Sequence, residues 1–403
     1  MITDNNKKLA QWAMDYALKN GCQAAKLVLY SNSNASFELR DAKMDRLQQA
    51  SESGLSISLY VDGRYGSYST NRLDKKELET FIKNGIESTR YLAVDEARVL
   101  PDASRYYKGG KPDLQLFDKR FETINPDDKV AIARAAAEEV LGKDSRIISV
   151  GTSYGDGESS SYRLTSNGFE GESKSTWFSL SADVALRGEG EARPSSYWYE
   201  SALFYDKLVK SGVGTKALER VLRKLGQKKV ASGKYTMVVD PMNASNLLSP
   251  VLSALYGSAL QQKNSFLLDK LNVKVGTGLL NLMDEPHLIG ASGARYFDSE
   301  GVATERRSIF EEGVLKTYFI DTYNSKKMGV EPTVNSPSLL VLKPGSKDLN
   351  GLVADVQKGI LVTGFNVGNC NSSSGDFSYG IEGFLIENGK LTQHLKEVYA
   401  HLE

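Results

Sequence analysis

Residues 55–61 read LSISLYV, and every second position in this stretch is Leu, Ile or Val. This period of two is typical of a β-strand that buries one of its faces. Asp62-Gly63 follows and favours a tight hairpin turn into the residues SYST at 67–70. The stretch therefore predicts an antiparallel hairpin, around which the neighbouring segments can be placed.

A helix is predicted on each side of this hairpin. Residues 5–20 carry apolar side chains at helical spacing, and Asp74 is positioned to cap a second helix. Between the first helix and the hairpin, Ala25–Tyr30 and Ser36–Arg40 are predicted as two separate strands. Residues 1–95 are therefore interpreted as an N-terminal α/β unit with antiparallel hairpins.

A second unit is predicted over residues 96–230, beginning with a Pro- and Gly-containing linker at 96–115. Asn125 is then expected to cap a helix that has Pro at its first position. Strand-like segments follow as in a meander, and two of them are RIISVGTSY and SYRLTSNG. The unit ends in an amphipathic helix predicted over 212–225.

The third unit is predicted to be a β-rich domain over residues 235–403. It opens with the buried-strand run YTMVVD. Asn246–Leu260 is apolar enough for a buried helix, with Pro250 placed in its first turn. Turns are predicted at Glu312-Gly313, Pro344-Gly345, Gly375-Asp376 and Asn388-Gly389. The predicted fold class of the whole chain is α+β.

Composition limits the classes of partner. The 403 residues carry 50 Lys and Arg against 50 Asp and Glu, so the formal net charge is zero. We expect no direct nucleic-acid partner, because the basic excess that attracts phosphate is missing. No membrane partner is expected either, since no stretch approaches the roughly 18 apolar residues of a spanning helix. With only Cys22 and Cys370 and no signal-peptide pattern at the N-terminus, the expected location is the cytoplasm.

Short motifs predict no self-sufficient catalytic centre. The histidines are His287, His394 and His401. A helix would place His394, Glu397 and His401 on one face, but the two histidines would lie about 10 Å apart along its axis, too far to share a metal ion easily. Ser153 sits in GTSYG, which matches the G-x-S-x-G nucleophile elbow. That elbow requires a helix after the serine, and a strand is predicted there instead.

Longer stretches of the third unit are more specific. They read KNSFLLDKL at 263–271, FDSEGVATERR at 297–307 and SGDFSYGIEGFLIENG at 374–389. Together they resemble the TldD/PmbA family, also called modulator of DNA gyrase, and within it the PmbA or TldE branch. The resemblance is close over 235–390 and looser in the N-terminal pattern of helices and hairpins.

This resemblance implies a role in proteolysis. The TldD branch is a group of zinc metallopeptidases with an H-E-x-x-x-H helix and a C-terminal cysteine ligand. The corresponding helix here, Asn246–Leu260, contains no His or Glu, and Cys370 lies before the position of the tail cysteine. The resemblance therefore implies a non-catalytic TldE/PmbA-like subunit without a cofactor of its own. It implies a heterodimer with a TldD-like partner that carries H-E-x-x-x-H and zinc, with short or unfolded peptides as substrates.

Six residues of these stretches are candidates for contacting a peptide or the partner. They are Asp298, Glu300, Arg306, Arg307, Asp376 and Tyr379. The two arginines could anchor a substrate carboxylate or pair across an interface. Asp298 and Glu300 could cap a turn or pair with those arginines. The alternative is a charged loop with a purely structural role. Asp376 and Tyr379 could line a peptide chamber, although Gly375-Asp376 is also an ordinary turn.

Two other functions stay open. One is an autonomous hydrolase with an unrecognised centre, such as Ser153 or the His394 and His401 pair. The other is a peptide-binding scaffold without a role in proteolysis, forming a homodimer through the same surface when no partner is present.

Overall fold

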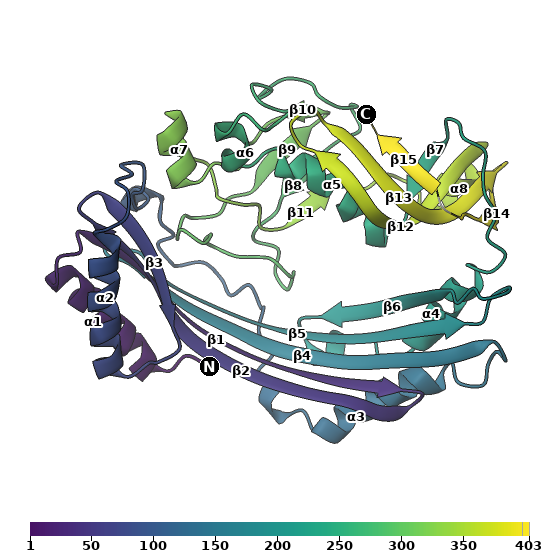
Figure 1. Cartoon of the computed structure of the whole chain (residues 1–403), viewed down its shortest axis with the longest axis horizontal. Helices are drawn as coiled ribbons and strands as arrows, with labels where there is room; N and C mark the ends of the chain where they lie inside the picture. Colours follow the sequence, from purple (N-terminus) through teal and green to yellow (C-terminus); the bar gives the residue numbers. More distant parts are fainter. Residues whose placement is uncertain (397, 403) are drawn as a thin grey trace.

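The computed structural model describes residues 1–396 and 398–402 of the chain. The helices are α1 (Asp4–Lys19), α2 (Lys75–Thr89), α3 (Pro126–Glu138), α4 (Val213–Leu222), α5 (Ala244–Ser253), α6 (Gly257–Gln261), α7 (Thr322–Met328) and α8 (Leu349–Ala354). The strands are β1 (Ala24–Arg40), β2 (Lys43–Val61), β3 (Arg64–Thr70), β4 (Ile147–Thr165), β5 (Glu170–Leu186), β6 (Ser195–Ala202), β7 (Thr236–Val239), β8 (Leu282–Asp284), β9 (Arg307–Glu311), β10 (Val314–Leu315), β11 (Leu340–Leu342), β12 (Lys358–Asn371), β13 (Asp376–Glu387), β14 (Lys390–His394) and β15 (Val398–Leu402). These described elements form three sheets, which confirms the α+β fold class (Figure 1).

The largest sheet has six strands in the order β3-β2-β1-β4-β5-β6. Its central pair, β1 and β4, is antiparallel from Lys26 opposite Thr165 to Arg40 opposite Gly151, with no shift of register. This long sheet forms the lower part of the molecule in Figure 1. The first and middle units predicted from sequence therefore share one sheet.

Two helix pairs cover the same face of this sheet. Near the start of β1, Leu27 and Leu29 pack into a core that also contains the apolar faces of α1 and α2. Near the end of β1, Phe37 and Leu39 pack into a second core with α3 and α4. All four residues are odd-numbered, and side chains alternate between the faces of a strand. The opposite face therefore carries the even-numbered side chains of β1.

Two helix caps, those of α2 and α3, agree with the sequence predictions, and the structure adds a third at α1. Thr3 caps α1 through a reciprocal pair of hydrogen bonds with Asn6. The Asp74 side chain accepts from the Glu77 amide at the start of α2. Asn125 caps α3, and Pro126 occupies the first position of that helix. The helices predicted over the N-terminal and middle units are confirmed.

The predicted strand lengths were wrong. Ala25–Tyr30 and Ser36–Arg40 belong to the single strand β1, and most of the segments RIISVGTSY and SYRLTSNG belongs to the single strand β4, which ends at Thr165. The polar middle of β1 remains a strand because it is paired on both sides. Asn32, for example, lies opposite Glu52 in β2 and Ser159 in β4. Pairing with two neighbours satisfies the backbone where the local sequence favours a turn.

Two smaller sheets form the C-terminal part. One has the order β10-β9-β8-β11, and the other is built from β14, β13, β12 and β7, with β15 also paired to β13. The predicted turns at Glu312-Gly313 and Asn388-Gly389 are confirmed, since each joins two paired strands. The predicted YTMVVD strand is β7, which pairs in parallel with β12.

The helix predicted over Asn246–Leu260 is interrupted. It divides into α5 and α6, and Pro250 lies inside α5 rather than in its first turn. The interruption has a tertiary cause at Tyr256. The Phe319 amide donates to the Leu255 carbonyl, and the Gly257 amide donates to the Phe319 carbonyl. This bridge takes the backbone groups that a continuous helix would use.

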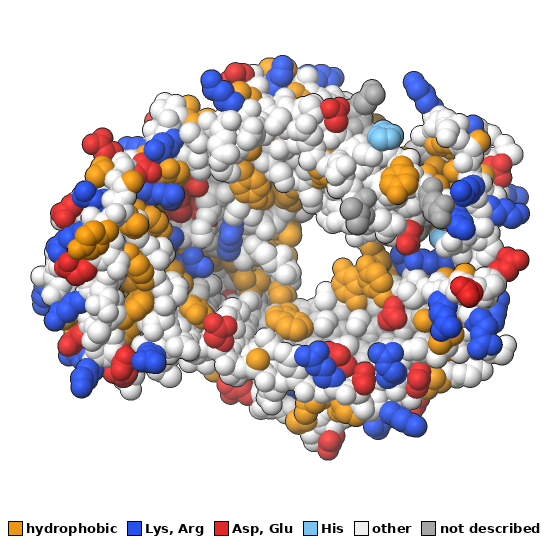
Figure 2. Space-filling model, in the orientation of Figure 1, with side chains coloured by type: hydrophobic (Ala, Val, Ile, Leu, Met, Phe, Trp, Pro, Cys, Tyr) orange, Lys and Arg blue, Asp and Glu red, His pale blue; other side chains and the backbone are white. Residues whose placement is uncertain are grey.

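The space-filling view shows an opening through the molecule, with hydrophobic side chains at its border (Figure 2). In the same orientation, the six-stranded sheet lies below this opening and the C-terminal sheets lie above it (Figure 1). The large sheet and the C-terminal sheets therefore enclose the opening between them, and we call this arrangement the frame. Among the described residues, no helix combines the length and the apolar character needed to cross a bilayer.

Close packing of α4 on α3 gives a first prediction. A Cβ atom at Gly214 would lie 2.1 Å from the Ala136 carbonyl oxygen. Gly214→Ala is expected to lower the free energy of unfolding by about 1–3 kcal/mol, because the two helices must separate. Gly151→Ala is the matched control, because nothing lies within 4 Å of a Cβ there. Urea denaturation compares the two variants, and equal stability would contradict the packing described.

Candidate functional site

Aromatic side chains lie on the face of the large sheet that the helices leave free. Trp177 in β5 is opposite Gly157 in β4, where a Cβ would come 2.5 Å from the indole nitrogen. Tyr197 and Tyr199 in β6 share this face, with ring centroids 6.5 Å apart. The three side chains are 43%, 57% and 47% exposed, in that order. Exposed aromatic rings on a strand surface can hold an extended chain through contacts that do not depend on its sequence.

The loop at 298–300 connects the C-terminal part to the large sheet at one side of the opening, and we call this contact the first joint of the frame. The Asp298 carboxylate accepts hydrogen bonds from the backbone amides of Glu300 at 2.9 Å, Val302 at 3.0 Å and Asn335 at 3.2 Å. Its side chain is buried. The expectation that Asp298 caps a turn is confirmed, and this turn lies against the large sheet because Arg163 Nη1 donates to the Ser299 carbonyl at 3.2 Å.

Glu300 is held within the same joint. Its carboxylate accepts from both the amide and the hydroxyl of Thr322, at 3.1 and 3.0 Å. Burial raises the pKa of this carboxyl group above its ordinary value. Lys26 from β1 faces the same loop, and its burial lowers the pKa of the ammonium group, with Glu300 acting in the opposite direction. The joint is thus a partly buried charged cluster between the sheet and the C-terminal part, with Asp298 as its buried member.

A second joint closes the other side of the frame. Lys224, just after α4, pairs with Glu382 of β13 at 2.7 Å. Arg220 in α4 pairs with Asp240 at 3.2 Å. The backbone continues this contact, because the Lys228 amide donates to the His394 carbonyl. The opening is therefore bounded by non-covalent contacts at two separate places.

The two candidate arginines do not pair with the acidic residues of the loop. Arg306 Nε lies 2.7 Å from a carboxylate oxygen of Glu285, and the Arg306 side chain is largely exposed. Arg307 Nε is 3.5 Å from the Glu305 carbonyl. The alternative that Asp298 and Glu300 pair with these arginines was therefore wrong. Contact of either arginine with a peptide or a partner stays a prediction.

Asp376 and Tyr379 lie on opposite faces of β13. The Asp376 carboxylate accepts from the Ser374 hydroxyl at 2.7 Å. The Tyr379 hydroxyl receives a hydrogen bond from the Cys370 thiol at 2.9 Å. Burial, with a further contribution from that thiol, raises the pKa of Tyr379 to about 12. The two residues are near each other along the chain but cannot line one side of a chamber together.

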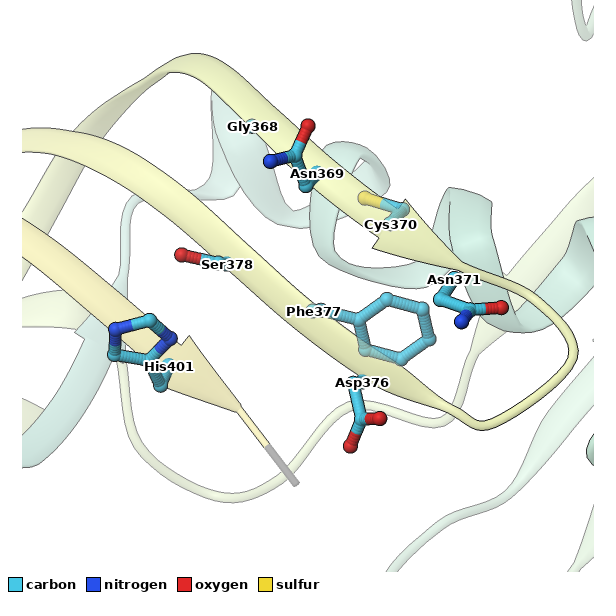
Figure 3. Close-up of a pocket in the computed structure, with 8 residues that line it drawn as sticks. All are labelled: Gly368, Asn369, Cys370, Asn371, Asp376, Phe377, Ser378 and His401. Atoms are coloured by element: carbon cyan, nitrogen blue, oxygen red, sulfur yellow. The ribbon is translucent and has the colours of Figure 1, made fainter.

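A cavity of 640 Å³ lies at the end of the C-terminal sheet, and Asp376 lines it. Figure 3 shows Asn369, Ser378 and His401 on three neighbouring strands around it. Ser378 is opposite Asn369 in β12 and opposite His401 in β15. No hydrogen bond joins Ser378 to His401 among the described residues. The row is polar but lacks the contact that activates a serine nucleophile.

The other chemical motifs do not assemble into a centre. Ser153 lies in the middle of β4, where its hydroxyl contacts Ser36 at 3.3 Å, so the nucleophile elbow is absent at this position. The helix considered for His394 and His401 was wrong, because they lie in β14 and β15. Glu397, which was grouped with them, lies outside the described residues. His287 contacts the Thr304 hydroxyl at 3.1 Å.

Side chains of the kinds that bind metal ions are not grouped among the described residues. Within residues 1–396 and 398–402, no three His, Cys, Asp or Glu side chains lie together in a way that could hold a metal ion. Two serines of α5, Ser249 and Ser253, donate to backbone carbonyls of their own helix. The described donor set therefore does not fit a zinc centre.

Comparison of the sequence with protein families assigns all three parts. The chain matches the PmbA/TldA metallopeptidase domain 1 at residues 25–89, the central domain at 119–225 and the C-terminal domain at 232–401. The chain belongs to the PmbA/TldD family. The resemblance found in the sequence is thereby confirmed.

Relatives match nearly the whole chain. A metalloprotease PmbA homolog from Haemophilus influenzae is 28% identical over 397 residues, which is 97% of this chain and 87% of that protein. A Bacteroides thetaiotaomicron crystal structure, whose name links it to modulation of DNA gyrase, is 76% identical with a TM-score of 0.98, covering 100% of this chain and 91% of that one. TldE from Thermococcus kodakarensis shares the fold, with a TM-score of 0.83 at 19% identity and coverage of 96% and 90%.

Sequence reasoning missed the aromatic face of this PmbA/TldD family member. One signal was present, since Tyr197 and Tyr199 are two residues apart in a predicted strand and must share a face. Trp177 carries no such signal, because its place over Gly157 depends on the register between β4 and β5. The position of Arg163 at the first joint likewise depends on contacts distant in sequence.

The second joint gives a prediction of stability. Lys224→Glu would place two carboxylates together, and we expect it to lower the free energy of unfolding by about 1 kcal/mol, a modest amount because Glu382 is partly exposed. The double variant Lys224→Glu with Glu382→Lys should recover most of that loss. Thermal unfolding of the single variants and the double variant measures the coupling. If the stability losses of the two single variants simply add in the double variant, Lys224 and Glu382 do not interact directly.

The buried His394 predicts a dependence of stability on pH. Neither ring nitrogen has a hydrogen-bond partner among the described residues. Burial lowers the pKa of His394 to about 4. Because the unfolded value is about 6.5, its neutral form stabilises the fold above that pH, and this contribution is lost as the pH falls towards 4.

Replacement by an aromatic ring without charge tests this assignment. His394 already packs against Phe384, with ring centroids 5.1 Å apart. Wild-type protein should lose about 2 kcal/mol more stability than His394→Phe between about pH 7 and about pH 4.5. Chemical denaturation at the two pH values measures the difference. Equal losses in both proteins would show that His394 is not a buried neutral group.

Proposed function

We propose that this chain is the non-catalytic TldE/PmbA-like subunit of a TldD/TldE-type zinc metallopeptidase that processes or degrades short or unfolded peptides. One observation carries the proposal. This chain belongs to a metallopeptidase family, yet it has neither His nor Glu in Asn246–Leu260, the segment that corresponds to the H-E-x-x-x-H helix. Without those side chains, this segment cannot bind zinc or activate water.

The chain's own contribution is to hold and select the peptide. The free face of β5 and β6 presents Trp177, Tyr197 and Tyr199 as an apolar surface for an extended chain. The opening beside the large sheet supports selection by size, because folded domains are far wider than a single extended strand (Figure 2). The residues of this subunit therefore bind and orient, and they move no proton in the reaction.

The zinc and the general base belong to the proposed partner. That partner is a TldD-like subunit with H-E-x-x-x-H, in which the metal would activate the attacking water. We place the complex in the cytoplasm, which agrees with two free cysteines in this chain, Cys22 and Cys370. Neither nucleic acid nor a membrane takes part in the proposed function.

Reconstitution tests the proposal. The chain is purified alone and after co-expression with a family member that carries H-E-x-x-x-H, and cleavage of an unfolded peptide is followed. We expect turnover only for the pair, and its loss when the first histidine of the partner motif is replaced by Ala. Trp177→Ala in this chain should raise the KM of the pair about threefold to tenfold, because one aromatic contact is lost. Turnover by the chain alone would refute the proposal.

An autonomous hydrolase is the second candidate, and it requires Ser378 and His401, which share no hydrogen bond in the described part of the chain, to come within hydrogen-bond distance. Ser378 lies opposite His401, and Asp376 lines the same cavity. This candidate predicts that the chain cleaves peptides or esters alone and that Ser378→Ala removes the activity. The same purified samples distinguish the two functions.

A further inference from the structure

Half of strand β5 is an open sheet edge. Strand β6 pairs only with residues 178–185 of β5. The Thr176 amide, further back along β5, donates outward to the Leu116 carbonyl at 3.0 Å. Because backbone groups alternate in direction, the amide and carbonyl groups of Glu172 and Lys174 also point outward. Among the described residues, no backbone hydrogen bond reaches them from that side.

A cavity of 720 Å³ lies against this edge, and we call it the β5-edge cavity. The linker before α3 provides one wall with Leu114, and the C-terminal part provides another with Tyr296. The Tyr296 ring is stacked on Tyr107 at 5.3 Å, and its hydroxyl donates to the Pro112 carbonyl at 2.7 Å. These contacts hold apolar surface next to unpaired backbone groups. An extended segment with an apolar side chain matches both features.

Arg163 places a positive charge in the β5-edge cavity. Its Nε–H is buried and has no hydrogen-bond partner, while its Nη1 donates to the Ser299 carbonyl. Asp298, whose negative charge acts on Arg163, already accepts hydrogen bonds from three backbone amides. No carboxylate lies within ion-pair distance of Arg163 among the described residues. A mostly buried guanidinium without an ion-pair partner is costly, so a bound carboxylate would stabilise it.

The remaining charges of the cavity also favour an anion. Its lining contains five cationic side chains against three acidic ones, which are Lys111, Lys119, Arg163, Lys174 and Arg295 against Asp113, Glu172 and Asp298. Glu172 is itself paired with Lys7 at 2.5 Å. Two of the cations are engaged as well, because Lys174 lies 3.6 Å from the same Glu172 carboxylate and Arg295 donates to the Ser338 hydroxyl at 2.9 Å. Arg163 has no such ion-pair partner among the described residues. Inorganic phosphate would satisfy the charge but would leave the sheet edge and the apolar walls unused.

We propose that the β5-edge cavity binds the C-terminal end of an extended peptide. The peptide backbone pairs with the outward groups of Glu172 and Lys174, its terminal carboxylate meets Arg163, and its last side chain lies between Leu114 and Tyr296. The inference rests on the proposed function only in taking a peptide as the ligand. It adds a site for one end of the peptide, away from any metal.

Binding to the full chain, without a partner, tests the inference. The probe is a fluorescein-labelled pentapeptide, Ser-Thr-Ser-Val-Leu, made with a free carboxylate and as the C-terminal amide. Fluorescence anisotropy should show about tenfold weaker binding of the amide. Arg163→Gln should weaken binding of the acid by about the same factor and remove the difference between acid and amide. Arg193→Gln, on an exposed loop, is the control and should change neither.

A second pair of variants tests the sheet edge. Lys174→Pro removes an outward amide hydrogen, a change that edge strands tolerate, and should weaken both peptides about tenfold. Lys174→Ala keeps that hydrogen and should reduce binding much less. Thermal unfolding confirms that each variant is folded.

Three results would overturn the inference: absence of binding, equal affinity of acid and amide for the wild-type chain, or equal effects of the two Lys174 variants. Failure of the proposed metallopeptidase would be seen separately, because no partner or zinc is present in this assay. Conversely, if the β5-edge cavity binds no peptide but the pair still cleaves peptides, the proposed function stands and only the inference about the cavity fails.

Discussion

The unbroken pairing of β1 with β4 is the constraint on which the rest of the structure depends. Side chains alternate along both strands, so a fixed register from Lys26 to Arg40 assigns every residue to one face. Leu27 and Phe37 belong to different hydrophobic cores, yet they point to the same side. Both helix pairs must therefore cover that side. A slip of one residue would bury polar side chains and expose both cores.

This constraint leaves the second face available for function. That face meets the C-terminal part at the joint around Asp298 and Glu300, and elsewhere it presents the exposed aromatic side chains of β5 and β6. Figure 2 shows hydrophobic side chains at the border of the opening. The Asp298 and Glu300 carboxylates of this joint accept hydrogen bonds from neighbouring groups, so they fix the position of the loop more than they stabilise the fold. A frame closed by two such joints keeps its opening without a continuous core across it. The proposed binding surface and the hydrophobic cores thus lie on opposite faces of one sheet.

Local signals in the sequence predicted the helices well. Asp74 and Asn125 cap their helices through neighbours two or three residues away, so nothing distant is needed to identify them. Strand lengths were not predictable in the same way. Residues 31–34 read SNSN, which favours a turn locally, yet they pair with β2 and β4 on both sides.

The candidate site shows the same division between local and distant information. The resemblance led to Asp298, whose role as a turn cap depends mainly on amides close to it in the chain. Arg163 was missed because its importance arises from a loop more than a hundred residues away. The interruption at Tyr256 was missed for the same reason, since Phe319 causes it. Sequence therefore indicated the family and the helices, while register and long-range contacts define the candidate binding surfaces.

The central proposal is that this chain supplies a peptide-binding frame and no metal chemistry. The most direct measurement is the zinc content of the chain purified alone, determined by inductively coupled plasma mass spectrometry after dialysis against buffered zinc. The account predicts no stoichiometric zinc. One zinc ion retained per chain, and lost on replacement of its own side chains, would contradict it.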